Sequence, residues 1–249
     1  MRLYGSIILE SESLNKVPQK HKTILSWSGG KDSAIALQRL LKNDQFSVER
    51  LLVSVNESTD RVSMHGVRKE LIEVQANFLG IPITFLNLPE NPSMQEYDNL
   101  MENQMKGLMN EGFTHCAFGD IFLEDLKKYR EKQLGKIGMK SIFPIWREDT
   151  TQLAKTFIDN GFKAIFVCVD KEKSISKFAG ELFSKQFLNE ISDDIDPCGE
   201  NGEFHTFVFE GPIFSEPIIC QKGDTVDKTY PSPEGEGEMI FRFCDLVLS

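Results

Sequence analysis

A short segment rich in serine and glycine follows the first apolar run of the chain and is suited to hold phosphate groups. It reads Ser26-Trp27-Ser28-Gly29-Gly30-Lys31-Asp32-Ser33. Its two glycines allow close approach of the backbone, and the first free N–H groups of a following helix form an anion site with the helix dipole. Lys31 would add a positive charge, and the hydroxyls of Ser28 and Ser33 could donate hydrogen bonds to a pyrophosphate. Asp32 could cap the helix or hold Mg²⁺ beside the phosphates.

The spacing of this segment separates it from two widespread phosphate-binding motifs. It matches neither GxxxxGK[ST] nor the GxGxxG turn of dinucleotide-binding folds. The competing interpretation is a helix cap that happens to contain two glycines.

Apolar runs and helical patterns alternate through the first half of the chain, an order typical of βαβ units that build a parallel sheet. Strands are predicted at 23–27, 51–55, 83–88, 114–118 and 141–146. Helices are predicted between them at 34–41, 67–78, 100–109 and 124–135. We therefore expect an α/β fold of Rossmann-like type, with a parallel five-stranded sheet and helices on both faces.

The second half has a different pattern. One more helix and strand are predicted at 151–160 and 163–169, followed by antiparallel strands at 204–209 and 239–248. The segment 221–238 contains prolines and glycines, which predict an exposed loop. We expect two domains, a phosphate-binding domain at 1–147 and a smaller α+β domain at 148–249.

Two further candidate positions fall where ligands bind in open parallel sheets, beyond the carboxyl ends of the strands. Gly119 and Asp120 follow the fourth predicted strand, where Asp120 could bind Mg²⁺ or a ribose hydroxyl. His65 precedes the second helix on the same side and could contact a nucleotide. The alternatives are a turn with a capping aspartate and a structural histidine.

A cationic cluster and an acidic turn complete the candidates. Lys127, Lys128 and Arg130 share one short helix, and Arg130 suits a bidentate grip on a carboxylate, although many such clusters are only solvated faces. The turn Glu200-Asn201-Gly202-Glu203, with His205 after it, could bind ammonium and accept its proton, or simply form the turn. Cys198 beside it is more typical of an inert apolar residue.

The Ser28–Ser33 segment resembles the PP-loop of ATP pyrophosphatases, enzymes that split ATP between its α and β phosphates. Four further segments make residues 22–215 similar to the diphthine–ammonia ligase family: Met64–Arg68, Gly119–Phe122, Tyr129–Glu131 and Cys198–Thr206. Asn201, where many members have glycine, makes the chain similar to the bacterial branch. Bacteria lack diphthamide, so the resemblance does not carry the substrate with it.

The resemblance implies a PP-loop domain of the adenine nucleotide alpha hydrolase type, followed by a substrate-binding domain. The implied reaction uses ATP and ammonia to turn a carboxylate into an amide through an acyl-adenylate. The expected cofactors are ATP and Mg²⁺, with Asp32 and Asp120 as metal ligands. Catalytic roles are expected of Lys31, Arg130, Glu200 and Glu203. Nucleotide contacts are expected from Ser26, Ser28, Gly29, Gly30, Lys31, Asp32, Ser33, His65, Gly119 and Asp120. Substrate contacts are expected from Arg130, Glu200, Asn201, Gly202, Glu203 and His205.

Composition and charge exclude several other classes of function. The net charge of −10 disfavours a nucleic-acid partner, and no apolar stretch suits a signal peptide or a membrane span. Five widely spaced cysteines fit a reduced, cytoplasmic compartment. The expected partners are ammonia and a small-molecule or protein-borne carboxylate, with diphthine, a corrinoid side chain and other metabolites left open. A homodimer is one expected form.

Two rival functions remain at this stage. A PP-loop enzyme that modifies tRNA would need a basic groove and often paired cysteines, and neither is visible in the sequence. A sensor that binds ATP or AMP without turnover would leave the acidic turn without a purpose.

Overall fold

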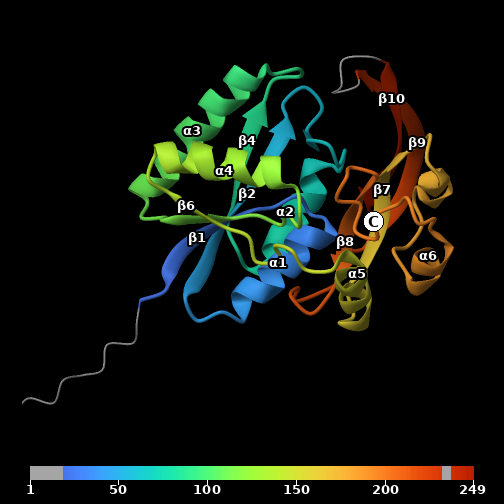
Figure 1. Ribbon diagram of the computed structural model, residues 1–249, viewed down its shortest axis with the longest axis horizontal. Helices are drawn as coiled ribbons and strands as arrows, with labels where there is room; N and C mark the ends of the chain where they lie inside the picture. Colours follow the sequence, from blue (N-terminus) through green and yellow to red (C-terminus); the bar gives the residue numbers. More distant parts are fainter. Residues whose placement is uncertain (1–18, 232–236) are drawn as a thin grey trace, which may run out of the picture.

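Two β-sheets of different kinds organise the chain in the computed structural model, which describes residues 19–231 and 237–249. Figure 1 shows the first sheet and its helices on the left and the second sheet on the right. The first sheet contains five parallel strands in the order β4-β2-β1-β5-β6. These strands are β1 (His21–Ser26), β2 (Phe46–Asn56), β4 (Ile83–Leu88), β5 (His115–Ala117) and β6 (Lys140–Ile142). The predicted five-stranded parallel sheet is confirmed, and a short β3 (Arg61–Val62) adds an antiparallel pair with β2.

Helices cover both faces of the first sheet because its strands are apolar on both sides. On β1, Leu25 belongs to a core with residues of α1 (Lys31–Leu41), α2 (Lys69–Leu79) and α5 (Thr150–Asp159). The preceding residue, Ile24, lies in a second core with residues of α3 (Met94–Asn110) and α4 (Glu124–Lys136). The alternation along one strand follows from the two-residue repeat of a β-strand.

The second sheet is antiparallel, in the order β8-β7-β10-β9. It is formed by β7 (Lys163–Asp170), β8 (Phe204–Glu210), β9 (Cys220–Pro231) and β10 (Glu238–Leu248). The short helices η1 (Ser174–Phe178) and α6 (Lys185–Glu190) precede β8 in the chain. Aromatic side chains, Phe166, Phe187 and Phe204 among them, pack around this sheet and belong to the same core cluster as α1 and α2. The division of the chain near residue 147 stays a prediction.

One element of the second half differs from expectation. The predicted loop at 221–238 is wrong over Gln221–Pro231, which belongs to β9 and pairs with β10 on both sides of an irregularity at Gly223 and Asp224. The prolines and glycines of 221–238 suggested a loop, but over Gln221–Pro231 the hydrogen bonds to β10 outweigh those propensities. Residues 232–236 lie outside the described part.

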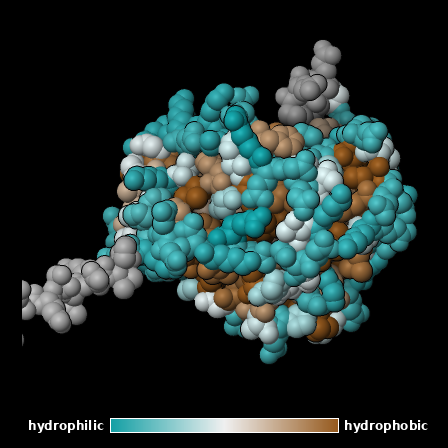
Figure 2. Space-filling view, turned by 60° about the horizontal axis from the view of Figure 1, so that its bottom comes forward, coloured by the Kyte–Doolittle hydropathy of each residue, from teal (hydrophilic) through white to brown (hydrophobic). Residues whose placement is uncertain are grey.

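Figure 2 shows one face on which hydrophilic residues predominate, with apolar patches between them. Among the helices of residues 19–231 and 237–249, none has the length and apolarity to cross a membrane.

A fully buried glutamine joins the two halves behind the phosphate-loop segment. Gln75 on α2 accepts a hydrogen bond from Trp27 Nε1 at 2.8 Å. Its amide nitrogen donates to the carbonyl oxygens of Gly29 at 3.0 Å and Val208 on β8 at 2.7 Å. Val208 N also donates to Gly29 O at 2.9 Å. One amide therefore fixes the end of β1, the start of the loop and a strand of the second sheet.

We expect Gln75→Leu to lower the free energy of unfolding by about 2–4 kcal/mol, because it leaves the Trp27 N–H and the Val208 carbonyl buried with fewer partners. Urea unfolding followed by circular dichroism would measure the change. Gln95→Leu is the matched control, since Gln95 is exposed on α3, and it should change stability by less than about 0.5 kcal/mol. Equal effects of the two substitutions would contradict the joining role of Gln75.

Candidate active site

A cavity of about 360 Å³ lies at the carboxyl ends of β1 and β5, where the second sheet meets the first. The helices that follow these adjacent strands, α1 and α4, cover opposite faces of the sheet, and such a point is where open α/β folds bind ligands. Most residues predicted for the site line this cavity: Ser26, Ser28, Gly30, Lys31, Asp32, Ser33, His65, Gly119, Asp120, Arg130, Glu200, Gly202 and His205. Gly29, Asn201 and Glu203, also predicted, lie outside its lining.

The loop before α1 is tightly packed. Gly30 N donates to Ser28 Oγ at 3.2 Å, and Ser33 Oγ lies 3.3 Å from Ser28 Oγ. A Cβ on Gly30 would lie 3.0 Å from the Thr206 carbonyl oxygen and 3.1 Å from His65 Nε2. Gly29 has a positive φ of 80°, and a Cβ there would meet Ile72 at 2.5 Å. Both glycines are therefore required by the space around them.

Lys31 is buried, with 2% of its surface exposed. Its ammonium donates to the two carboxylate oxygens of Asp32 at 3.0 and 2.9 Å and to the carbonyl oxygen of Cys198. It also lies 5.1 Å from the centre of the Phe204 ring. Burial lowers the pKa of Lys31, but its electrostatic interactions and hydrogen bond with neighbouring groups, Asp32 foremost, together raise it by more, so the net shift is upward and the ammonium stays charged. The side chain thus ties the loop to the second half, and its contact with phosphate stays a prediction.

Gly119 and Asp120 lie against the start of α1. A Cβ on Gly119 would come within 3.0 Å of the Ser33 nitrogen. The Asp120 carboxylate, nearly buried, lies 2.5 Å from Arg130 Nε, and the guanidinium of Arg130 stacks on the Phe118 ring at 4.2 Å. Arg130 lies on α4 with Lys127 and Lys128, and of these three predicted cations only Arg130 lines the cavity. Its predicted grip on a carboxylate would compete with Asp120.

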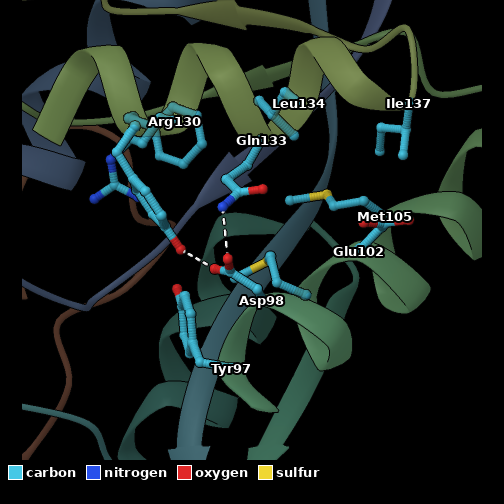
Figure 3. Close-up of a pocket in the computed structure, with 11 residues that line it drawn as sticks. Tyr97, Asp98, Glu102, Met105, Arg130, Gln133, Leu134 and Ile137 are labelled. Atoms are coloured by element: carbon cyan, nitrogen blue, oxygen red, sulfur yellow. Dashed lines mark hydrogen bonds between the residues drawn. The ribbon is translucent and has the colours of Figure 1, made fainter. Parts of the chain in front are cut away.

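A second, smaller cavity of about 40 Å³ between α3 and α4 shares Tyr97, Phe118 and Arg130 with the first. Figure 3 shows Asp98 at its centre, with Gln133 of α4 pointing toward it. Asp98 accepts hydrogen bonds from the Tyr129 hydroxyl and from Gln133 Nε2, the latter at 2.6 Å. These bonds hold α4 against α3 and so position Arg130.

Glu200 is the carboxylate of the acidic turn that reaches the cavity. Its Oε1 accepts hydrogen bonds from the backbone nitrogens of Ile121 at 2.7 Å and Phe122 at 3.2 Å. Burial, with a contribution from the nearby carboxylates of Asp32 and Asp120, raises the pKa of Glu200 to about 7. A carboxyl group with such a pKa can both accept and release a proton near neutral pH.

Glu203 lies beneath the turn, with only 1% of its surface exposed. Its Oε1 accepts from the backbone nitrogen of Asp196 and from Asn201 Nδ2, both at 3.1 Å. Its Oε2 is buried without a hydrogen-bond partner among the described residues. In this position Glu203 shapes the turn, and its predicted catalytic role stays a prediction.

Two stacked histidines close another side of the cavity. The rings of His65 and His205 lie 4.4 Å apart. Burial lowers the pKa of His205 to about 4 and that of His65 well below its ordinary value, so both rings are neutral at pH 7. The segment between β3 and α2 carries His65 and is called the His65 loop. It is held by β10, where Asp245 binds both Arg61 and Arg68 at 2.7 Å.

Ser54, Tyr97 and Thr206 line the cavity but were not among the predicted contacts. Thr206 Oγ1 accepts from the backbone nitrogen of Lys31 at 3.1 Å and so caps α1 from the second sheet. Within the described ranges no group of three or more histidine, cysteine or acidic side chains could hold a metal. Cys198 is buried, which raises the pKa of its thiol and opposes a nucleophilic role.

Both halves of the chain match models of known protein families. Residues 21–141 match the family model for the diphthamide synthase N-terminal domain, and residues 149–230 match the model for its C-terminal domain. The diphthine–ammonia ligase of Danio rerio is 22% identical and covers 80% of this chain and 86% of its own length. The Rattus norvegicus enzyme is 26% identical, with 80% and 82% covered. The Schizosaccharomyces pombe enzyme is 22% identical over 80% of this chain, which spans 36% of that protein.

A search of solved structures finds the U34-tRNA thiolase NcsA from Methanococcus maripaludis with its [4Fe-4S] cluster. The two chains are 19% identical, and the alignment covers 58% of this chain and 59% of the thiolase with a TM-score of 0.35.

The raised pKa of Glu200 makes stability depend on pH. Because the folded-state pKa of about 7 exceeds the ordinary value of 4.5, the folded protein favours the protonated carboxyl. This contribution to stability is fully present below about pH 4.5 and is lost as the pH rises through about 7. We expect the free energy of unfolding of the wild type to fall relative to that of Glu200→Gln across this window. Urea unfolding of both proteins at several pH values measures the difference.

The contribution of His65 and His205 to the pH dependence of stability cancels in this comparison, because both histidines are present in both proteins. Parallel stability curves for the wild type and Glu200→Gln would contradict a pKa near 7 for this carboxyl.

Proposed function

Since this chain belongs to the diphthamide synthase family, we propose that it is an ATP-dependent ligase that joins ammonia to a carboxylate and releases AMP and pyrophosphate. The observation that carries the proposal is the cavity itself. The Ser28–Ser33 loop, the Gly119–Asp120 turn and Glu200 all line it, although they come from three distant parts of the sequence. A nucleotide and a carboxylate bound there would share one space.

We propose that ATP lies across the ends of β1 and β5, with its β and γ phosphates against the Ser28–Ser33 loop. The glycines let the backbone approach, and the first turn of α1 directs its N–H groups and the positive end of its dipole to the phosphates. Asp32 and Asp120, which line the cavity on adjacent segments, would hold Mg²⁺ together with phosphate oxygens. Mg²⁺ bound there would neutralise charge on the departing pyrophosphate.

The reaction then takes two steps. A carboxylate oxygen attacks the α-phosphorus, and the bond to the bridging oxygen of pyrophosphate breaks. Ammonia attacks the carbonyl carbon of the acyl-adenylate, AMP leaves, and the nitrogen loses a proton. Glu200 is the group suited to accept that proton, because its pKa is raised to about 7 and it lies on the cavity wall.

Two sets of carboxylates are candidate substrates. The curated relatives are named for diphthine and ammonia, so a diphthine-bearing elongation factor is the first substrate to test. Metabolite carboxylates, corrinoid side chains among them, form the second set. The buried position of Glu203 makes Glu200 the cleaner residue with which to separate a ligase from a nucleotide sensor.

We expect incubation with ATP, ammonium chloride and the diphthine-bearing factor to release AMP and pyrophosphate in equal amounts with the amide. Chromatography of radiolabelled ATP and mass spectrometry of the acceptor measure the products. Glu200→Gln should retain ATP affinity and lose about 10²-fold or more in turnover, as expected for removal of a general base. Release of ADP and orthophosphate with amide formation would contradict the scheme.

A second test concerns the loop. A methyl group on Gly30 would press against Thr206 O and His65 Nε2, so Gly30→Ala should weaken binding of a non-hydrolysable ATP analogue by about tenfold or more, which corresponds to roughly 1.4 kcal/mol. Isothermal titration calorimetry measures the affinity. Gly107→Ala on α3, where a Cβ would meet nothing within 4 Å, is the control and should bind like the wild type. Unchanged affinity in a folded Gly30→Ala protein would remove the loop from the nucleotide site.

A further inference from the structure

The outermost strand of the second sheet has an unpaired edge. Among the described residues, β9 pairs only with β10, and every residue from Asp224 to Pro231 is exposed. Figure 1 shows the β9–β10 hairpin on the side of the molecule away from β1 and β6. Val226 and Tyr230 are 47% and 43% exposed on this strand. Long exposed edges of this kind tend to pair with another strand.

We propose that β9 pairs with β9 of a second copy of this chain, antiparallel and about a two-fold axis at Val226, so that the two four-stranded sheets join into one. A two-fold axis perpendicular to a sheet keeps side chains on their own face. Residues that lie opposite each other must then have sequence numbers that are both even or both odd. The charges on β9 decide between the registers that remain.

With the axis at Val226, Asp224 lies opposite Lys228 of the second copy, and the pair occurs twice. Opposite charges across antiparallel strands stabilise the pairing, and like charges weaken it. On the same face Val226 meets its own copy. Neither Asp224 nor Lys228 forms an ion pair with another described residue of its own chain.

Neighbouring registers bring like charges together. An axis at Thr225 places Lys222 opposite Lys228, and an axis at Asp227 places Asp227 opposite itself. Axes at Asp224 and Lys228 likewise oppose each of these residues to its own copy. The Val226 register is therefore the symmetric arrangement near the middle of the strand with two opposite-charge pairs and no like-charge pair.

The β9–β10 hairpin is also held by ion pairs within its own chain. Asp227 points to the other face, where it binds Arg242 of β10 at 2.8 Å and Lys171 at 2.7 Å. The backbone beside the proposed axis is thus held by its own chain, so little ordering is needed when a second copy binds.

Charge exchange tests the register in the full-length protein. Light scattering after size exclusion should give the wild type about twice the monomer mass of 28.3 kDa. Lys228→Glu and Asp224→Lys should each give monomers, because each opposes like charges. The double variant Asp224→Lys with Lys228→Asp restores opposite pairs and should return to the dimer. Thermal unfolding of each variant checks that the fold is kept.

A single introduced cysteine tests the axis. Val226→Cys should form a disulfide-linked dimer under mild oxidation, since its two copies face each other. Thr229 is also exposed, but the two copies of Thr229→Cys would lie six residues apart along the strand, roughly 20 Å, and should stay unlinked. A monomeric wild type at all concentrations, a dimer that survives Lys228→Glu, or equal cross-linking at 226 and 229 would each overturn the proposal.

Discussion

The buried ammonium of Lys31 is the interaction on which the arrangement of the site depends. A charge removed from water must be paired, or the protein loses several kcal/mol. Asp32, the next residue, supplies the negative charge, but the carbonyl of Cys198 and the ring of Phe204 come from the second half of the chain. The loop and the acidic turn therefore hold each other in place, and neither can move far without exposing an unsatisfied ion.

The same arrangement explains why a cavity forms at this point. Gln75 fixes the back of the loop to β8, Thr206 caps the first turn of α1, and Glu200 bonds to the backbone before α4. Each of these contacts joins the second half of the chain to the first at a different residue. The space left between them is lined by polar side chains of the loop and the turns together with apolar ones such as Trp27, Phe118 and Leu126.

Sequence patterns predicted the parallel sheet and most of the cavity lining because both depend on local rules. Alternating apolar runs define strands, and glycines beside serines and a lysine mark a tight loop at the start of a helix. The patterns could not show that Gln75 matters, since a lone polar residue in a helix carries no motif. They included Thr206 in the Cys198–Thr206 segment but gave it no role. They also could not tell that Glu203 lies beneath its turn while Glu200 faces the cavity, because only the fold of the turn separates two carboxylates so close in sequence. The β9 strand was missed because its stability comes from β10 rather than from its own composition.

The hold of Asp245 on the His65 loop has a consequence for synthesis on the ribosome. Arg68 and its partner are 177 positions apart, and the aspartate lies on the last strand of the second sheet. The parallel sheet can assemble while the chain is still being made, since domains fold as they emerge. One wall of the cavity would stay unsupported until β10 has been added, so a nascent chain with a complete phosphate loop would still lack a finished site. In this order of assembly the cavity is completed last, after the acidic turn has been synthesised.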